Sequence, residues 1–219
     1  MAATNRLLES WAGYATATIS DCLDRLQAMH SGIRLLSGEG LVGHAFTVET
    51  GAGDSATLHR ALELVPPDSV LVVDAAGHLG RAVWGNVLSV AAMRRGVRGI
   101  VVDGVIRDLA EIHAAGFVTY ARGVCPAGPH KGFQGRWGEP IQCGGVVVAT
   151  GDLVVGDGDG VVVVPASRID ETERAVLATE ERERLLLEDV NRGATTAELL
   201  GLKHPSGLPA VRATKRGKR

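Results

Sequence analysis

The chain has 219 residues, of which 45% are hydrophobic and 22% are charged, and its 23 basic and 25 acidic residues give a formal net charge of −2. This composition supports a buried core and excludes an intrinsically disordered protein. The 3 cysteines are far apart and odd in number, so neither a disulfide framework nor a zinc finger is predicted, and we expect a cytoplasmic protein. Because no apolar run is long enough to span a bilayer, we expect no membrane association.

Positive charge is concentrated at the C-terminus. Six Lys or Arg residues and no acidic residue lie from residue 202 onward, so the rest of the chain has a formal charge of −8. We predict that residues 1–201 form a single domain and that residues 202–219 form a flexible basic tail, which contains Pro and Gly but no apolar periodicity. An acidic body and a tail without aromatic residues make nucleic acid an unexpected partner.

The N-terminal half alternates between helical and strand patterns. We expect helices over residues 5–13, 19–27, 54–64 and 83–95, and strands over residues 41–49, 69–74 and 99–102. Ser69–Asp74 and Gly99–Val102 are apolar runs of the kind that strands show when both of their faces are buried. This alternation predicts a sheet with parallel strands and helices packed on it.

The pattern changes after Glu111. We expect a short helix to residue 115, a strand over 117–120, a Gly- and Pro-rich loop over 123–140, and strands over 145–149, 153–155 and 161–164. Gly156–Gly160 resembles part of a calcium loop but lacks its terminal glutamate, so we predict a tight turn. With helices over residues 167–189 and 195–200, the chain is expected to form a layered α/β/β/α fold, neither a Rossmann sheet nor a barrel.

An adjacent Arg107-Asp108 pair follows the predicted strand that starts at Gly99, and we expect Gly104 to turn the chain there. Ligands of open α/β sheets bind at the carboxyl ends of the strands. Arg107 offers a planar charged group for a carboxylate, and Asp108 offers oxygen ligands for a divalent cation. Alternatively, Asp108 caps a helix and Glu111 completes a capping box. The residues alone leave both interpretations open.

The segment Trp84–Leu88 opens a helix about one βα unit earlier. A helix start leaves backbone N–H groups unpaired, and these can bind a carboxylate. If the two strands are neighbours, these groups, Arg107 and a cation on Asp108 would meet around one small α-keto acid. Ordinary capping by Asn86 is the alternative explanation of this segment.

A set of motifs extends over residues 19–165. They are Ile19-Ser-Asp-Cys-Leu23, the helix over 54–64, Leu71-Val-Val-Asp74, Gly85-Asn86 followed after twenty residues by Arg107-Asp108-x-x-Glu111, Gly128-Pro-x-Lys131, Cys143-Gly-Gly145 and Gly156–Pro165. Together they resemble the RraA-like family, which comprises the 4-hydroxy-4-methyl-2-oxoglutarate / 4-carboxy-4-hydroxy-2-oxoadipate aldolases and the regulators of ribonuclease E activity. The resemblance implies a swivelling β/β/α fold, a homotrimer or homohexamer with sites between subunits, and Mg²⁺ or Mn²⁺ as cofactor.

The resemblance also implies roles for individual residues. Asp108 would bind the metal, Arg107 would contact the keto oxygen, and the N–H groups of Val87 and Leu88, beside Gly85, would hold the carboxylate.

Two further positions bear on catalysis. Asn86 stands where aldolases of the family often carry an acid, whereas Glu111 matches the RDxxE/D pattern of the aldolase branch. Glu183 of a neighbouring subunit is the expected additional acid.

We therefore expect a metal-dependent carbon–carbon lyase that releases pyruvate from these two keto acids, with oxaloacetate decarboxylation as a side activity. A water molecule is the expected base, because the sequence places no histidine at the site. One alternative is a non-catalytic regulator that binds a ribonuclease or helicase. The Arg107-Asp108-Glu111 set favours catalysis, whereas Asn86 and the basic tail leave room for this regulator. The other alternative is a lyase of the same fold that acts on another keto or hydroxy acid.

Overall fold

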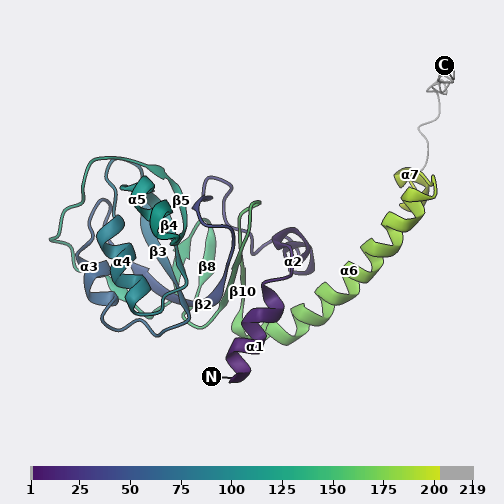
Figure 1. Ribbon diagram of the computed structural model, residues 1–219, viewed down its shortest axis with the longest axis horizontal. Helices are drawn as coiled ribbons and strands as arrows, with labels where there is room; N and C mark the ends of the chain where they lie inside the picture. Colours follow the sequence, from purple (N-terminus) through teal and green to yellow (C-terminus); the bar gives the residue numbers. More distant parts are fainter. Residues whose placement is uncertain (1, 203–219) are drawn as a thin grey trace, which may run out of the picture. The chain divides into compact units, whose positions relative to one another are not determined.

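The structure, a computed structural model, describes residues 2–202 (Figure 1). The chain divides into two compact units, the first ending at Thr179 and the second beginning at Glu180. The basic tail predicted from residue 202 lies outside the described residues, except for Leu202. A single domain over residues 1–201 stays a prediction.

The first unit contains most of the helices and all of the strands of the described chain. Its helices are α1 (Ala2–Trp11), α2 (Thr16–Cys22), α3 (Ala56–Ala61), α4 (Asn86–Arg94), α5 (Leu109–Ala115), the 3₁₀ helix η1 (Ala166–Arg168) and the start of α6 (Ile169–Asn191). Its strands are β1 (Arg34–Ser37), β2 (Leu41–Glu49), β3 (Ser69–His78), β4 (Gly99–Ile106), β5 (Val118–Val124), β6 (Arg136–Trp137), β7 (Ile141–Cys143), β8 (Val146–Val148), β9 (Leu153–Gly156) and β10 (Val161–Val164).

Seven strands form one path in the order β1-β5-β4-β3-β2-β9-β10, and β6 pairs with β2 beside this path. Strands β2, β3, β4 and β5 are parallel to one another, whereas β1 pairs antiparallel with β5, and β9 pairs antiparallel with β2 and β10. Strands β7 and β8 form a separate antiparallel pair. The carboxyl ends of four central strands therefore meet at one edge, as the βα alternation predicts.

The core has two sides, because successive strand residues point to opposite faces of the sheet. On one face, α3, α4 and α5 pack against β2 to β5 through residues such as Leu58, Leu88 and Ile112, and Figure 1 shows these helices gathered beside β3, β4 and β5. The β7–β8 pair packs on the opposite face through Ile141 and Val148. The layered α/β fold, with its curled sheet, is thus confirmed.

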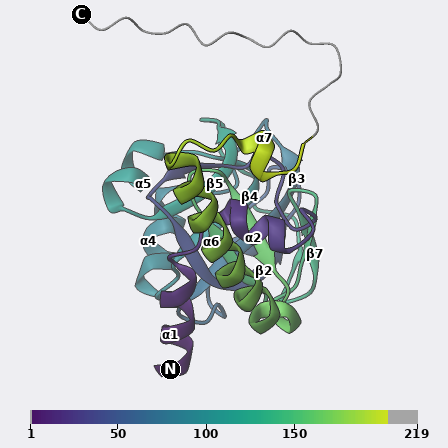
Figure 2. The ribbon, with the colours of Figure 1, turned by 90° about the vertical axis from the view of Figure 1, so that its right-hand side faces the viewer.

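The first turns of α6 close a third core cluster together with α1 and α2. Trp11, Ile19 and Val176 pack there against residues of β2, β9 and β10, and Figure 2 views α1, α2 and α6 from their side of the molecule. The turn predicted at Gly156–Gly160 joins β9 to β10. The Asp157 carboxylate in this turn accepts hydrogen bonds from the backbone N–H of Thr16 at 2.9 Å and from its hydroxyl at 2.7 Å.

Several element boundaries differ from the predictions. The second helix ends at Cys22 rather than residue 27, because Asp24 and Arg25 adopt left-handed conformations with φ of 57° and 63°. Strand β4 continues to Ile106 through an irregularity between Val102 and Val105. Gly104 therefore lies within the strand, and its predicted role as the turn is wrong.

The predicted loop over 123–140 is interrupted by structure. Strand β5 extends to Val124, and Arg136–Trp137 forms β6 by pairing with Val48 and Glu49. Strands β1 and β7 were not predicted either. Strands β1 and β6 are short and form through partners distant in sequence, which local periodicity does not reveal. Strand β7 has three residues and pairs with the adjacent β8.

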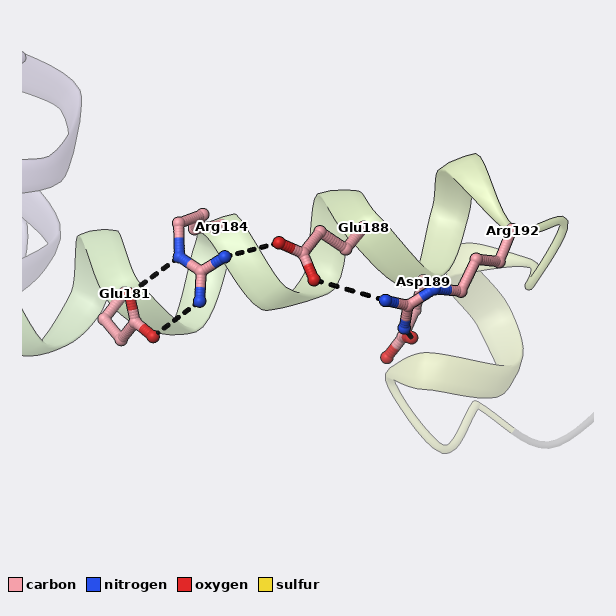
Figure 3. Close-up of polar contacts among 5 residues, drawn as sticks. All are labelled: Glu181, Arg184, Glu188, Asp189 and Arg192. Atoms are coloured by element: carbon pink, nitrogen blue, oxygen red, sulfur yellow. Dashed lines mark hydrogen bonds and ion pairs between the residues drawn. The ribbon is translucent and has the colours of Figure 1, made fainter.

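The second unit holds the rest of α6 and the helix α7 (Thr196–Leu199). Figure 3 shows a row of ion pairs on α6, in which Arg184 bridges Glu181 and Glu188 while Arg192 contacts Glu188 and Asp189. Both helices agree with their predicted ranges to within two residues. No helix within residues 2–202 combines the length and apolar character that crossing a membrane requires.

Candidate functional site

A cleft of about 330 Å³ opens in the first unit where strand β4 ends. Four chain segments line it: the start of α3, the two segments that follow β3 and β4, and the loop before β6. The lining residues are Ser55, His59, Val83, Trp84, Gly85, Val87, Leu88, Arg107, Asp108, Gly128, Pro129 and Lys131. This volume lies in the range of small-molecule sites.

The predicted meeting of the Trp84–Leu88 segment with the Arg107-Asp108 pair is present in the structure. Strands β3 and β4 are parallel neighbours. The backbone N–H of Arg107 donates to the carbonyl of Trp84 at 3.0 Å. Arg107 Nε lies 3.6 Å from Asp108 Oδ2, and the side chains are 44% and 36% exposed. Both charged groups are therefore accessible from the cleft.

Asp108 directly precedes α5, but its side chain does not cap that helix. Its left-handed backbone (φ 58°, ψ 39°) accompanies a carboxylate that accepts the backbone N–H of Asn86 through Oδ2 at 3.1 Å. Within the described residues, Oδ1 has no hydrogen-bond partner. The capping-box alternative is therefore wrong. Glu111, in the first turn of α5, is exposed and does not line the cleft.

Helix α4 directs its N-terminus at the same cleft. Its N-cap is Gly85, in extended conformation and without a side-chain hydrogen bond, so the alternative of capping by Asn86 is wrong. Asn86 occupies the first helical position, and its N–H is bound by Asp108. The N–H groups of Val87 and Leu88 are the next two of the helix start, which have no acceptor within the helix. They are placed to receive an anionic oxygen.

Two contacts fix this helix start. The indole Nε1 of buried Trp84 donates to Ser89 Oγ at 2.8 Å, and the Ser89 hydroxyl donates to the Gly85 carbonyl at 3.2 Å. A Cβ at Gly85 would lie 2.6 Å from Asp108 Oδ2. Glycine is therefore required here by the close approach of Asp108 rather than by its backbone angles.

The lining also includes His59 on α3 and Lys131 on the loop before β6. Buried Asp54 holds this loop by accepting the N–H groups of Gly132 at 2.7 Å and Phe133 at 3.0 Å. Burial alone would raise the pKa of Asp54, but backbone hydrogen bonds, including one from Ala56, together with the charge of His130, outweigh it and hold the pKa below the ordinary 3.8. The carboxylate therefore stays charged and the loop stays in place.

The sequence did not place any histidine at the site, but His59 lines the cleft. The imidazole has no hydrogen-bond partner among the described residues. Burial, and next the charge of Lys131, lower the pKa of His59 below 6.5. The Gly128-Pro-x-Lys131 motif was the available indication, because the loop that carries it reaches α3.

The cleft suits a cation that is shared with a ligand. Residues 2–202 contain no group of three or more His, Cys, Asp or Glu side chains that could hold a metal alone, and Asp108 is the acidic residue in the lining. Mg²⁺ characteristically keeps several waters and uses one or two carboxylates together with substrate oxygens. A half-exposed carboxylate with a free oxygen fits that mode. Glu183 lies exposed on α6 in the second unit, and its role from a neighbouring subunit stays a prediction.

Comparisons with known proteins identify the family of the chain. The family described as RraA-like, Aldolase/RraA, matches residues 16–163. A Halalkalibacterium halodurans protein named "Putative 4-hydroxy-4-methyl-2-oxoglutarate aldolase" is 37% identical over 196 residues, which are 87% of this chain and 92% of that protein.

Two solved structures are also similar. Streptomyces coelicolor RraAS2, described as an unusual member of the RNase ES inhibitor RraA protein family, has a TM-score of 0.74 and 32% identity over 85% of this chain and 98% of its own. A Pseudomonas syringae pv. tomato protein has a TM-score of 0.77 and 30% identity over 89% of this chain and 96% of its own.

Proposed function

The chain belongs to the RraA-like family, and we propose that it is a divalent-metal-dependent lyase that cleaves 4-hydroxy-4-methyl-2-oxoglutarate or 4-carboxy-4-hydroxy-2-oxoadipate and releases pyruvate. The observation that carries the proposal is the convergence of Asp108, Arg107 and the start of α4 on one cleft of small-molecule size. Oxaloacetate decarboxylation is proposed as a side activity, because it yields the same pyruvyl fragment.

Asp108, Arg107 and the start of α4 each have a proposed role in that reaction. The N–H groups of Val87 and Leu88 bind the carboxylate of the pyruvyl end. Arg107 donates a charge-assisted hydrogen bond to the keto oxygen, where negative charge develops as the carbon–carbon bond breaks. Asp108 would hold Mg²⁺ or Mn²⁺, and such a cation supplies positive charge that stabilises that oxygen by several kcal/mol.

Glu111, Glu183 and the assembly of subunits are also proposed to contribute to the site. Glu111 lies on the helix that follows Asp108 and is proposed to act through the position of Asp108, since it does not line the cleft. A homotrimer or homohexamer is proposed, with Glu183 of a neighbouring subunit adding an acid to the site.

The test is pyruvate release from both keto acids and from oxaloacetate, with Mg²⁺ or Mn²⁺ and again with a chelator. We expect turnover that the chelator abolishes and that Asp108→Ala lowers at least about 1,000-fold, which is about 4 kcal/mol of transition-state stabilisation. Asp170→Ala is the matched control, because Asp170 is an exposed carboxylate on α6 outside the cleft lining. An active Asp108→Ala protein would contradict the metal-binding role.

A second candidate is a regulator that binds a ribonuclease or helicase. The observation that favours it is the similarity of the chain to RraAS2, which is described within an RNase ES inhibitor family. The family resemblance adds that Asn86 stands where aldolases often carry an acid. If the wild-type protein releases no pyruvate from any of the three substrates and binds a partner equally well with and without chelator, the regulator is supported. Turnover of a different keto or hydroxy acid would select a lyase of the same fold.

A further inference from the structure

We propose that His59 is the general base of the cleft and takes the proton of the substrate's C4 hydroxyl during aldol cleavage. The inference rests on the proposed function and adds to it the group that moves the proton. Its basis is that the His59 imidazole, which has no hydrogen-bond partner among the described residues, lines the same cleft as Arg107 and Asp108, and that no other lining side chain suits this task.

The remaining polar side chains of the lining do not suit it. Arg107 and Lys131 are cations, and the Ser55 hydroxyl is not basic at neutral pH. Asp108 accepts the Asn86 N–H and is the proposed cation ligand. Asn86, which stands where an acid is often found in the family, carries an amide that does not accept a proton. His59 is therefore the lining group whose basicity matches neutral pH.

Backbone hydrogen bonds hold the start of the helix that carries His59. Its helix, α3, begins after Ser55, whose backbone N–H donates to the His130 carbonyl at 3.0 Å, and the His130 N–H donates to Gly53 at 2.8 Å. The same loop carries Lys131 to the cleft. The Asp54 carboxylate holds this loop by accepting hydrogen bonds from two of its backbone N–H groups. The base and its cationic neighbour thus belong to one hydrogen-bonded unit.

Charge around His59 favours the neutral imidazole. Lys131 lies close enough to lower its pKa, in addition to burial. The other charged groups of the cleft are Arg107 and Asp108, and Arg60 is its neighbour on α3. A histidine whose pKa is below its usual value is mostly neutral at pH 7 and is ready to accept a proton.

The proton balance of the step is complete without another reactant. The hydroxyl proton moves to the free imidazole nitrogen, and the O–H electron pair forms the new C4 carbonyl. The C3–C4 bond breaks, and its electron pair is delocalised into the pyruvyl fragment as an enolate. The imidazolium then returns its proton to C3, which gives pyruvate and regenerates neutral His59.

Oxaloacetate provides an internal comparison, because loss of carbon dioxide requires no proton removal before the bond breaks. His59→Ala is expected to lower kcat for aldol cleavage at least about 100-fold but to lower oxaloacetate decarboxylation about tenfold or less. Added imidazole is expected to restore part of the cleavage activity. His113→Ala is the control, since His113 is an exposed histidine on α5 outside the lining and should leave both reactions unchanged.

A second variant tests the charge relationship. Lys131→Met removes the charge that disfavours imidazolium, so the acidic limb of the kcat profile should move to higher pH. Equal losses of both reactions in His59→Ala, or cleavage at the wild-type rate, would overturn the role of His59 while the lyase proposal stands. A wild-type protein that releases no pyruvate from any substrate would overturn both, so the two failures are distinguishable.

Discussion

The cleft of the first unit and the α6 surface of the second unit use the same residue types in opposite ways. On α6, Arg184 and Arg192 pair with acids three or four residues away on the same helix, in full contact with solvent. In the cleft, Asp108 Oδ2 accepts a backbone N–H from a different element and lies 3.6 Å from Arg107 Nε. The other carboxylate oxygen has no hydrogen-bond partner among the described residues. The charged side chains of α6 pair with one another, whereas Arg107 and Asp108 in the cleft keep hydrogen-bonding capacity for a ligand.

This difference shows why a count of ion pairs is a poor guide to function. Exposed pairs within one helix contribute little, because solvent screens them and two long side chains must be ordered. A carboxylate that is buried and bound by backbone N–H groups, such as Asp54, has no solvent to replace its partners. Substitutions of the backbone-bound groups should therefore have larger effects on stability or activity than substitutions of the ion pairs on α6.

The largest effect on stability is expected at Asp54. Asp54→Ala leaves the N–H groups of Ala56, Gly132 and Phe133 without their acceptor, so the free energy of unfolding should fall by about 3 kcal/mol. Urea denaturation at pH 7 measures this, with Asp54→Asn as the milder variant that keeps one acceptor oxygen. A decrease in the free energy of unfolding as small as that from removing an exposed ion pair would show that Asp54 stabilises the fold no more than the pairs on α6 do.

The pH dependence of that effect follows from the sign of the shift. The pKa of Asp54 is lower in the folded protein than its ordinary 3.8, so its contribution is fully present above the unfolded-state value. It is lost as the pH falls through the lower, folded-state value. The difference between wild type and Asp54→Ala should therefore shrink in acid, and a difference that grows in acid would contradict this assignment.

A smaller effect, on activity rather than stability, is expected at Gly85. The new Cβ of Gly85→Ala would lie 2.6 Å from Asp108 Oδ2 and 3.2 Å from Arg107 Cγ. Displacing these groups should lower kcat/KM about 10- to 100-fold and change the free energy of unfolding by about 1 kcal/mol or less. Gly158→Ala, where an added Cβ meets nothing within 4 Å, is the matched control. Unchanged kcat/KM in Gly85→Ala would show that the reaction does not depend on the geometry of the start of α4.

The smallest effect is expected on α6. Arg184→Ala removes the contacts with Glu181 and Glu188, yet the Tm should change by about 1 °C or less, because exposed pairs are weak. Thermal unfolding at low and high salt measures this, and pyruvate release should be unchanged. A fall of several degrees would show that this row of ion pairs stabilises more than its own helix.

Much of the fold followed from the sequence because its signals are local. The apolar runs at Ser69–Asp74 and Gly99–Val102 marked two central strands, and the intervening helix implied that they are parallel neighbours. That inference placed Arg107 and Asp108 beside the start of α4. Strand β6 could not be predicted in this way, because two residues become a strand only through pairing with β2.

The part of the cleft around His59 depended on tertiary structure. His59 is one of 7 histidines, and nothing in its spacing distinguishes it from the rest. Its place in the cleft results from the way Asp54 binds a loop nearly eighty residues away. The turn after β4 was similarly assigned to the wrong residue, because glycine is the usual residue at such turns, whereas here Asp108 adopts the left-handed conformation itself.

That conformation bears on how this position tolerates mutation. Asparagine and glycine are the other residues that adopt left-handed backbone angles readily, and a single nucleotide change converts an aspartate codon into a codon for either. The negative charge at residue 108 can therefore disappear in one mutational step while the turn is kept. With the proposed role of Asp108, such a step would remove the metal ligand and leave the scaffold intact, and selection on partner binding alone would preserve that scaffold.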